Sequence, residues 1–278
     1  MTRKNINKYI STLIFYVVGG LTAAILLIPF FWMIVTSLKT KGALLSIPVE
    51  WIPKNPSLAA YEKIFKLEGF SKAIFNSFYL AITTTIVQIL SASMAAYAFS
   101  KIRFKGNEAL FRVYLATMMI PFQVVFIPLF IISSSLRLTN SLNAFLLLQL
   151  FNPFAIFMLR QKMMGINDSF IEAAIIDGAN HFHIFTKVIL PLSSGVIATL
   201  GIMSFMGSWN DYLLPLVMIS DKKKFTLPLI LNSLNGQYGS DYNLLMAGSL
   251  ISIIPILIVF MFAQKYFRSG LQVGGVKA

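Results

Sequence analysis

The chain has 278 residues, of which 57% are hydrophobic and 12% are charged. Soluble domains carry about 25% charged residues, so this composition excludes an ordinary soluble globular protein. The absence of cysteine excludes disulfides and thiolate metal sites. A net charge of +13 would indicate a nucleic-acid partner in a soluble protein, but the basic residues here flank apolar runs, which fits lipid headgroups better.

Long apolar runs follow one another along the sequence. A helix needs about 20 apolar residues to cross the hydrocarbon core of a bilayer. The sequence therefore predicts an all-α polytopic membrane protein in which residues 1–278 form one transmembrane domain. About six spans are expected, at residues 10–35, 73–100, 108–132, 142–160, 194–219 and 244–264.

The first run resembles the start of a secretory signal peptide, because Arg3, Lys4 and Lys8 precede it. A signal core holds about 7–15 apolar residues, whereas this run continues to Val35. We therefore interpret it as a retained first span.

Several predicted spans contain breaks or small residues. Prolines lie inside most of them, and each proline removes a backbone hydrogen bond and kinks its helix. Asn152 and Pro153 interrupt the fourth span. In the fifth span, small residues such as Ser204, Gly207 and Ser208 permit close helix contact, which is a packing signal rather than a sign of chemistry.

The connection at 161–193 is long and polar. With six spans, it lies on the same side of the membrane as both termini and the tail at 265–278. That side holds 13 of the 23 Lys and Arg residues, so the positive-inside rule weakly favours cytoplasmic termini.

Within this connection the sequence predicts a short helix that begins near Ser169, which forms a capping box with Glu172. Helical spacing places Phe170, Ala173, Ala174 and Asp177 on one face. The two alanines would leave a low surface into which a partner could fit.

A turn and a second helix are expected to follow. Gly178 can adopt the left-handed conformation that ends a helix, and Asn180 can cap the next helix. Pro191 then leads into the fifth span.

This segment resembles the EAA loop of ABC importer permeases, whose pattern is E-A-A, three residues, G, nine residues and I-x-L-P. Val188 stands where the family usually has isoleucine. The residues that fall in register are Glu172, Ala173, Ala174, Gly178, Leu190 and Pro191.

The resemblance extends over nearly the whole chain and is closest to the smaller permease subunit of maltose-type importers, in the carbohydrate-uptake branch. The matching segments are Pro48–Trp51, Asn55–Pro56, Tyr61, Asn76–Ser77, Ala95–Phe99, Arg103–Phe104, Gly106, Trp209–Asp211, Pro215–Leu216, Gly270–Leu271 and Gly274–Lys277.

The resemblance implies a multi-pass permease in the bacterial inner membrane, with both termini in the cytoplasm. Its implied partners are a second, different permease, two copies of an ATP-binding subunit, an extracytoplasmic solute-binding protein and a sugar, expected to be a di- or oligosaccharide. This chain would bind no cofactor, because ATP belongs to the partner subunits. The ATPase would dock on the loop through Glu172, Ala173, Ala174, Asp177, Gly178, Leu190 and Pro191.

Polar residues within the spans are candidates for the translocation path. Asp211 is the one acidic residue well inside a predicted span, where a carboxylate is costly and by default functional. A structural acid near the outer interface is the alternative. Asn210, Gln88 and Gln123 carry amides that suit sugar hydroxyls but also join helices.

The sequence holds no catalytic constellation. It has no phosphate-binding loop of the Walker type, so no ATP hydrolysis by this chain is expected. His181 and His183 lack the neighbours of a metal site. Two alternatives remain: a permease of the same family for a solute such as a phosphorylated polyol, and an ion-coupled secondary transporter.

Overall fold

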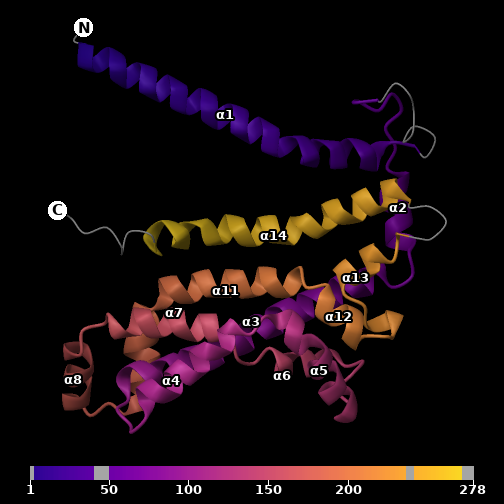
Figure 1. Ribbon diagram of the computed structural model, residues 1–278. Coiled ribbons are helices and arrows are strands. Elements are labelled where there is room, and N and C mark those ends of the chain that lie inside the picture. Colours follow the sequence, from indigo (N-terminus) through magenta and orange to yellow (C-terminus); the bar gives the residue numbers. More distant parts are fainter. Residues whose placement is uncertain (1–2, 41–49, 236–240, 271–278) are drawn as a thin grey trace. The chain divides into compact units, whose positions relative to one another are not determined.

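The computed structural model describes residues 3–40, 50–235 and 241–270 (Figure 1). Every regular element in these residues is a helix, and they contain no strand. The chain divides into two compact units, residues 1–68 with 231–254 and residues 69–230 with 255–278. The expected all-α fold is confirmed, whereas the assignment of 1–278 to one domain stays a prediction.

The first unit contains α1 (Arg3–Leu38), α2 (Ala59–Lys66) and the first half of α14 (Tyr242–Gly270). Gly248 lies where α14 meets α2. A Cβ atom at this position would lie 2.4 Å from Cδ2 of Leu231 and 2.5 Å from Cδ1 of Ile64. Glycine therefore leaves the space on α14 that these two side chains fill.

The second unit is organised around α3 (Phe70–Lys101), which packs against α7 (Pro153–Met164) and α11 (Ser194–Trp209) (Figure 1). Ala92 and Ala96 of α3 are fully buried. Their small side chains let the neighbouring helices come close to α3. Both candidate sites described below contain residues that contact α3.

Within the described residues, three helical segments are long and apolar enough to cross a membrane: Ser11–Leu38, Phe70–Lys101 and Tyr242–Phe262. Three further candidates are pairs of helices joined by a bend. Counting each bent pair as one span gives six, the number expected from the sequence. The positions of the membrane boundaries stay predictions.

The third predicted span, 108–132, is not one continuous helix. It consists of α4 (Asn107–Ala116), a 3₁₀ turn η2 (Thr117–Met119) and α5 (Phe122–Ser135). The two parts meet at a bend of 98°. Pro121 explains the break, because proline disfavours helical backbone in the residue before it, and Ile120 is extended.

The fourth span is also bent, as the Asn152–Pro153 pair indicated. Its parts are α6 (Leu142–Leu148) and α7, which meet at 50°. Pro153 stands in the first turn of α7, where its missing N–H costs no helical hydrogen bond.

The fifth predicted span, 194–219, is likewise not one continuous helix. After α11 ends at Trp209, a non-helical step precedes α12 (Leu213–Met218). Upstream, the helical stretch His181–Leu192 joins α11 at a bend of 79°. The chain then continues through η4 (Lys222–Lys224) and α13 (Leu227–Asn232).

Residues 271–278, in the predicted tail, lie outside the described part, as do Pro48 and Val49 of the segment used for the resemblance.

Candidate functional site

The first candidate site is the loop at 161–193, whose first helix is α8 (Ser169–Ile176). The helix begins where expected, but the capping box does not form. Ser169 is already the first helical residue, and the preceding Asp168 makes no side-chain capping bond. Instead, Oδ1 of Asn167 accepts a hydrogen bond from the Ser169 N–H at 3.0 Å. This Asx turn satisfies one of the free N–H groups at the helix start.

The turn after α8 confirms the prediction for Gly178, whose φ is +77°. Its N–H donates to the Ile175 carbonyl at 2.9 Å, and the N–H of Ala179 donates to the Ala174 carbonyl at 2.9 Å. These two bonds form a Schellman motif, which reverses the chain at the helix end. The turn therefore sets the direction in which α8 points.

The second helix of the loop is capped as predicted. Oδ1 of Asn180 accepts a hydrogen bond from the His183 N–H at 2.8 Å at the start of α9 (His181–Ile184). A π-helical turn η3 (Phe185–Ile189) and α10 (Leu190–Leu192) follow. Leu190 packs against the core, whereas Pro191 is exposed in the first turn of α10.

Apolar side chains of the loop are exposed in this chain. Phe170 is 54% exposed, Ile176 86% and Phe182 75%. Glu172, Ala173 and Asp177 are exposed beside them, and α8 has no buried residue. We call the six residues the α8 face. Large exposed apolar side chains gathered on two consecutive short helices of one loop are typical of a protein interaction site.

One part of the sequence interpretation is corrected here. Ala174 does not share the low outer surface with Ala173, because it packs with Ile171 against the core of the second unit. The two alanines are adjacent in sequence, so they are separated by about 100° around the helix. Ala173 alone supplies the low exposed surface.

The loop is hydrogen-bonded to the end of α3 through Lys101. The Nζ of Lys101 donates to the Ile166 carbonyl at 2.7 Å and to Oδ1 of Asp168 at 2.5 Å. The hydrogen bond from Lys101 and the charge of its ammonium lower the pKa of the Asp168 carboxyl from its ordinary 3.8, so this carboxyl is ionised at neutral pH.

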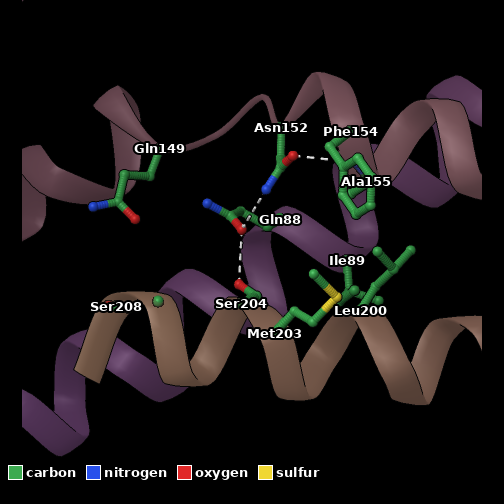
Figure 2. Close-up of a pocket in the computed structure, with 11 residues that line it drawn as sticks. Gln88, Ile89, Gln149, Asn152, Phe154, Ala155, Leu200, Met203, Ser204 and Ser208 are labelled. Atoms are coloured by element: carbon green, nitrogen blue, oxygen red, sulfur yellow. Dashed lines mark hydrogen bonds between the residues drawn. The ribbon is translucent and has the colours of Figure 1, made fainter. Parts of the chain in front are cut away.

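The second candidate site is a cavity of about 220 Å³ between α3, α7 and α11. Oε1 of Gln88 accepts hydrogen bonds from the Ser204 hydroxyl at 2.7 Å and from Nδ2 of Asn152 at 3.4 Å. Figure 2 shows Gln88 reaching between these two side chains. Gln149 and Ser208 also line the cavity, so its polar groups are neutral amides and hydroxyls.

Only one of the four predicted path residues lies in this cavity, namely Gln88. Asn210 and Asp211 stand in the break between α11 and α12. Nδ2 of Asn210 donates to the Met206 carbonyl at 2.9 Å, and Oδ1 of Asp211 accepts from the Leu214 N–H at 3.3 Å. Asp211 is therefore not inside a continuous helix.

Gln123 is exposed on α5 and does not line the cavity. Sequence reasoning missed Gln149, Asn152, Ser204 and Ser208 as cavity residues. The available signals were the break at Asn152 and the small residues of the fifth span, both of which were interpreted as features of backbone and packing.

Comparisons with known proteins agree with this architecture. A family model described as binding-protein-dependent transport system inner membrane component matches residues 88–273. The chain is 35% identical over 255 residues to the arabinooligosaccharides transport system permease protein AraQ of Bacillus subtilis (strain 168), with 90% of each chain covered. It is 32% identical to the probable starch degradation products transport system permease protein AmyC of Thermoanaerobacterium thermosulfurigenes, with 100% of both covered.

A solved structure shares the fold. A chain from the crystal structure of a bacterial ABC transporter involved in the import of the acidic polysaccharide alginate matches with a TM-score of 0.86 and 25% identity, covering 96% of this chain and 99% of that chain. The family model spans more than half of the present sequence. The chain therefore belongs to the family of binding-protein-dependent transport system inner membrane components, the permeases of ABC importers.

Proposed function

We propose that this chain is one of two different permease subunits of an ATP-driven sugar importer and forms half of its translocation path. Similar proteins carry names that refer to arabinooligosaccharides and starch degradation products. These names support a di- or oligosaccharide as the transported solute. An extracytoplasmic binding protein would deliver the sugar to the outer side of the membrane.

The cavity beside α3 supports a neutral sugar. Its described polar lining consists of amides and hydroxyls, which can both donate to and accept from sugar hydroxyls. A phosphorylated polyol would call for Lys or Arg in the lining, and an ion-coupled carrier for ionisable groups near the membrane midplane. Neither kind of residue is among those that line the cavity, so these alternatives are less well supported.

The α8 face supports the second part of the proposal, the coupling to an ATP-binding subunit. Its exposed apolar side chains stand next to Glu172 and Ala173 on a helix whose direction is set by a Schellman turn. We propose that an ATP-binding subunit docks there, with the loop and both termini in the cytoplasm. Closure of two such subunits on ATP would move α8 and open the path alternately to each side. ATP would be hydrolysed on those subunits alone.

A single bulky side chain on the α8 face tests the docking. Ala173→Trp adds volume at the low exposed position, and Lys105→Trp adds the same side chain at an exposed position between α3 and α4. We expect Ala173→Trp to lose the ATP-binding subunits on purification with the partner permease, or to lose sugar-stimulated ATP hydrolysis. Lys105→Trp should retain both. Full stimulation in the Ala173 variant would refute docking at this face.

A further inference from the structure

Two side chains of the last turns of α3 contact the loop at 161–193, here called the coupling loop, on both sides of α8. They are Tyr97 and Lys101, which stand four residues apart and therefore on one face of the helix. We infer that this pair, the α3 clamp, is the element that passes a displacement of α8 on to the transmembrane helices. The inference rests on the proposed docking of an ATP-binding subunit at α8.

The first contact of the clamp precedes α8. The Lys101 side chain is only 6% exposed, and its ammonium reaches the Ile166 carbonyl and the Asp168 carboxylate. A buried ammonium is costly unless it is paired and hydrogen-bonded, so this arrangement holds the backbone firmly just before the helix. The Asp168 side chain, by contrast, is 65% exposed.

The second contact follows α8. Tyr97 is 6% exposed, and a hydrogen bond of 3.1 Å joins its hydroxyl to Nδ1 of His181 at the start of α9. Its ring packs on Phe185 with the ring centroids 5.3 Å apart. The two contacts thus enclose α8 and its Schellman turn between residues 166 and 185.

Between these contacts α8 is held weakly. It has no buried residue, and only Ile171 and Ala174 pack partly against the core. A force applied to the α8 face is therefore carried into the unit chiefly through the chain on either side of it. That chain is bonded to Tyr97 and Lys101, so α3 receives the displacement.

α3 can carry this displacement over a distance. Its 32 residues form one helix without an internal proline. Lys101 lies 13 residues after Gln88, which corresponds to about 20 Å along the axis. Gln88 bonds to Ser204 of α11 and to Asn152 at the start of α7. One helix therefore joins the coupling loop to the polar cavity.

The experiment compares coupling with assembly in the complete importer. Lys101→Met removes the charge and keeps the stem, Lys101→Arg restores a cation, and Tyr97→Phe removes only the hydroxyl. Glu108→Gln is the matched control, because Glu108 forms an ion pair with the buried Arg160 at the same end of α3, and neither partner belongs to the loop at 161–193. Arg160 also donates from Nε to the Phe99 carbonyl at 3.1 Å.

The readout is the number of sugar molecules imported per ATP hydrolysed, together with co-purification of the ATP-binding subunits and the melting temperature of the complex. Energetic coupling between sites typically amounts to about 5–150-fold. We expect the ratio to fall at least about fivefold in Lys101→Met, less in Tyr97→Phe, and to recover in Lys101→Arg. The ATP-binding subunits should stay bound in all variants.

Two outcomes would overturn the clamp. One is an unchanged ratio in Lys101→Met and Tyr97→Phe. The other is an equal fall in the Glu108→Gln control, which would mean that any loosening at this end of α3 has the same effect. Failure of the proposed docking gives a different result, namely that the Ala173→Trp variant keeps its ATP-binding subunits and its full sugar-stimulated ATP hydrolysis.

Discussion

The coupling loop and the polar cavity both contact α3 but are built in different ways. The loop is one continuous segment, in which spacing along the sequence fixes the geometry. The cavity combines side chains from α3, α7, α11 and the link before α7, which meet only after folding. The loop therefore depends on backbone conformation at single positions, whereas the cavity depends on hydrogen bonds between distant residues.

The largest effect is expected at the turn of the loop. Gly178 has φ +77°, and an added Cβ would meet no atom within 4 Å, so the cost of a side chain there is one of backbone conformation. A left-handed residue other than glycine costs about 1–2 kcal/mol, and asparagine tolerates this conformation best. Gly178→Val should reduce sugar uptake about tenfold or more, and Gly178→Asn should retain most of it.

Uptake of radiolabelled sugar and co-purification of the two permeases measure this prediction. The permeases should remain together in both variants, because the turn lies outside the spans. Equal uptake by the valine and asparagine variants would mean that the left-handed turn does not control coupling.

A smaller effect is expected in the cavity. Gln88→Leu removes the acceptor for Ser204 and Asn152, and each such hydrogen bond contributes about 1 kcal/mol. We expect the KM for transport to rise several-fold while the complex assembles normally. Gln123→Leu makes the same change at an exposed position on α5 and should leave KM unaltered. An equal rise in KM for Gln123→Leu would show that the effect of Gln88→Leu does not come from its place in the cavity.

The smallest effect is expected at Asp211. Asparagine keeps a side-chain oxygen for the Leu214 N–H, so Asp211→Asn should change uptake less than twofold. Asp211→Leu removes the acceptor and should lower the melting temperature through the loss of about 1 kcal/mol. A large loss of uptake in Asp211→Asn would instead assign the negative charge to the translocation path.

The sequence predicted the loop well where one residue decides the conformation. Gly178 and Asn180 adopt the expected turn and cap because glycine and asparagine meet local backbone requirements that few residues can meet. The capping box predicted for Ser169 and Glu172 does not form, because Ser169 is itself the first helical residue and its N–H is bound by Oδ1 of Asn167, two residues earlier. Local competition of this kind depends on geometry that spacing alone does not show.

The cavity and the α3 clamp could not be predicted in this way. Gln88 was singled out for its amide, but its partners Asn152 and Ser204 lie 64 and 116 residues away. Lys101 and Asp168 are likewise 67 residues apart. Six apolar runs predict where the membrane-spanning segments lie, whereas the register in which α3 meets α7 and α11 arises from side-chain packing throughout the unit.

At the π-helical turn η3, the loss of a single residue would change the orientation of the loop without any substitution. The turn begins at Phe185, on which the Tyr97 ring packs, and ends just before α10. A π turn closes its hydrogen bonds over one more residue than an α turn does. Loss of one residue there would restore α-helical bonding without breaking the helix. It would also rotate His181 and the chain before it by about 100° relative to α11. A change of length by one residue can therefore alter the direction in which α8 points while both neighbouring helices remain intact.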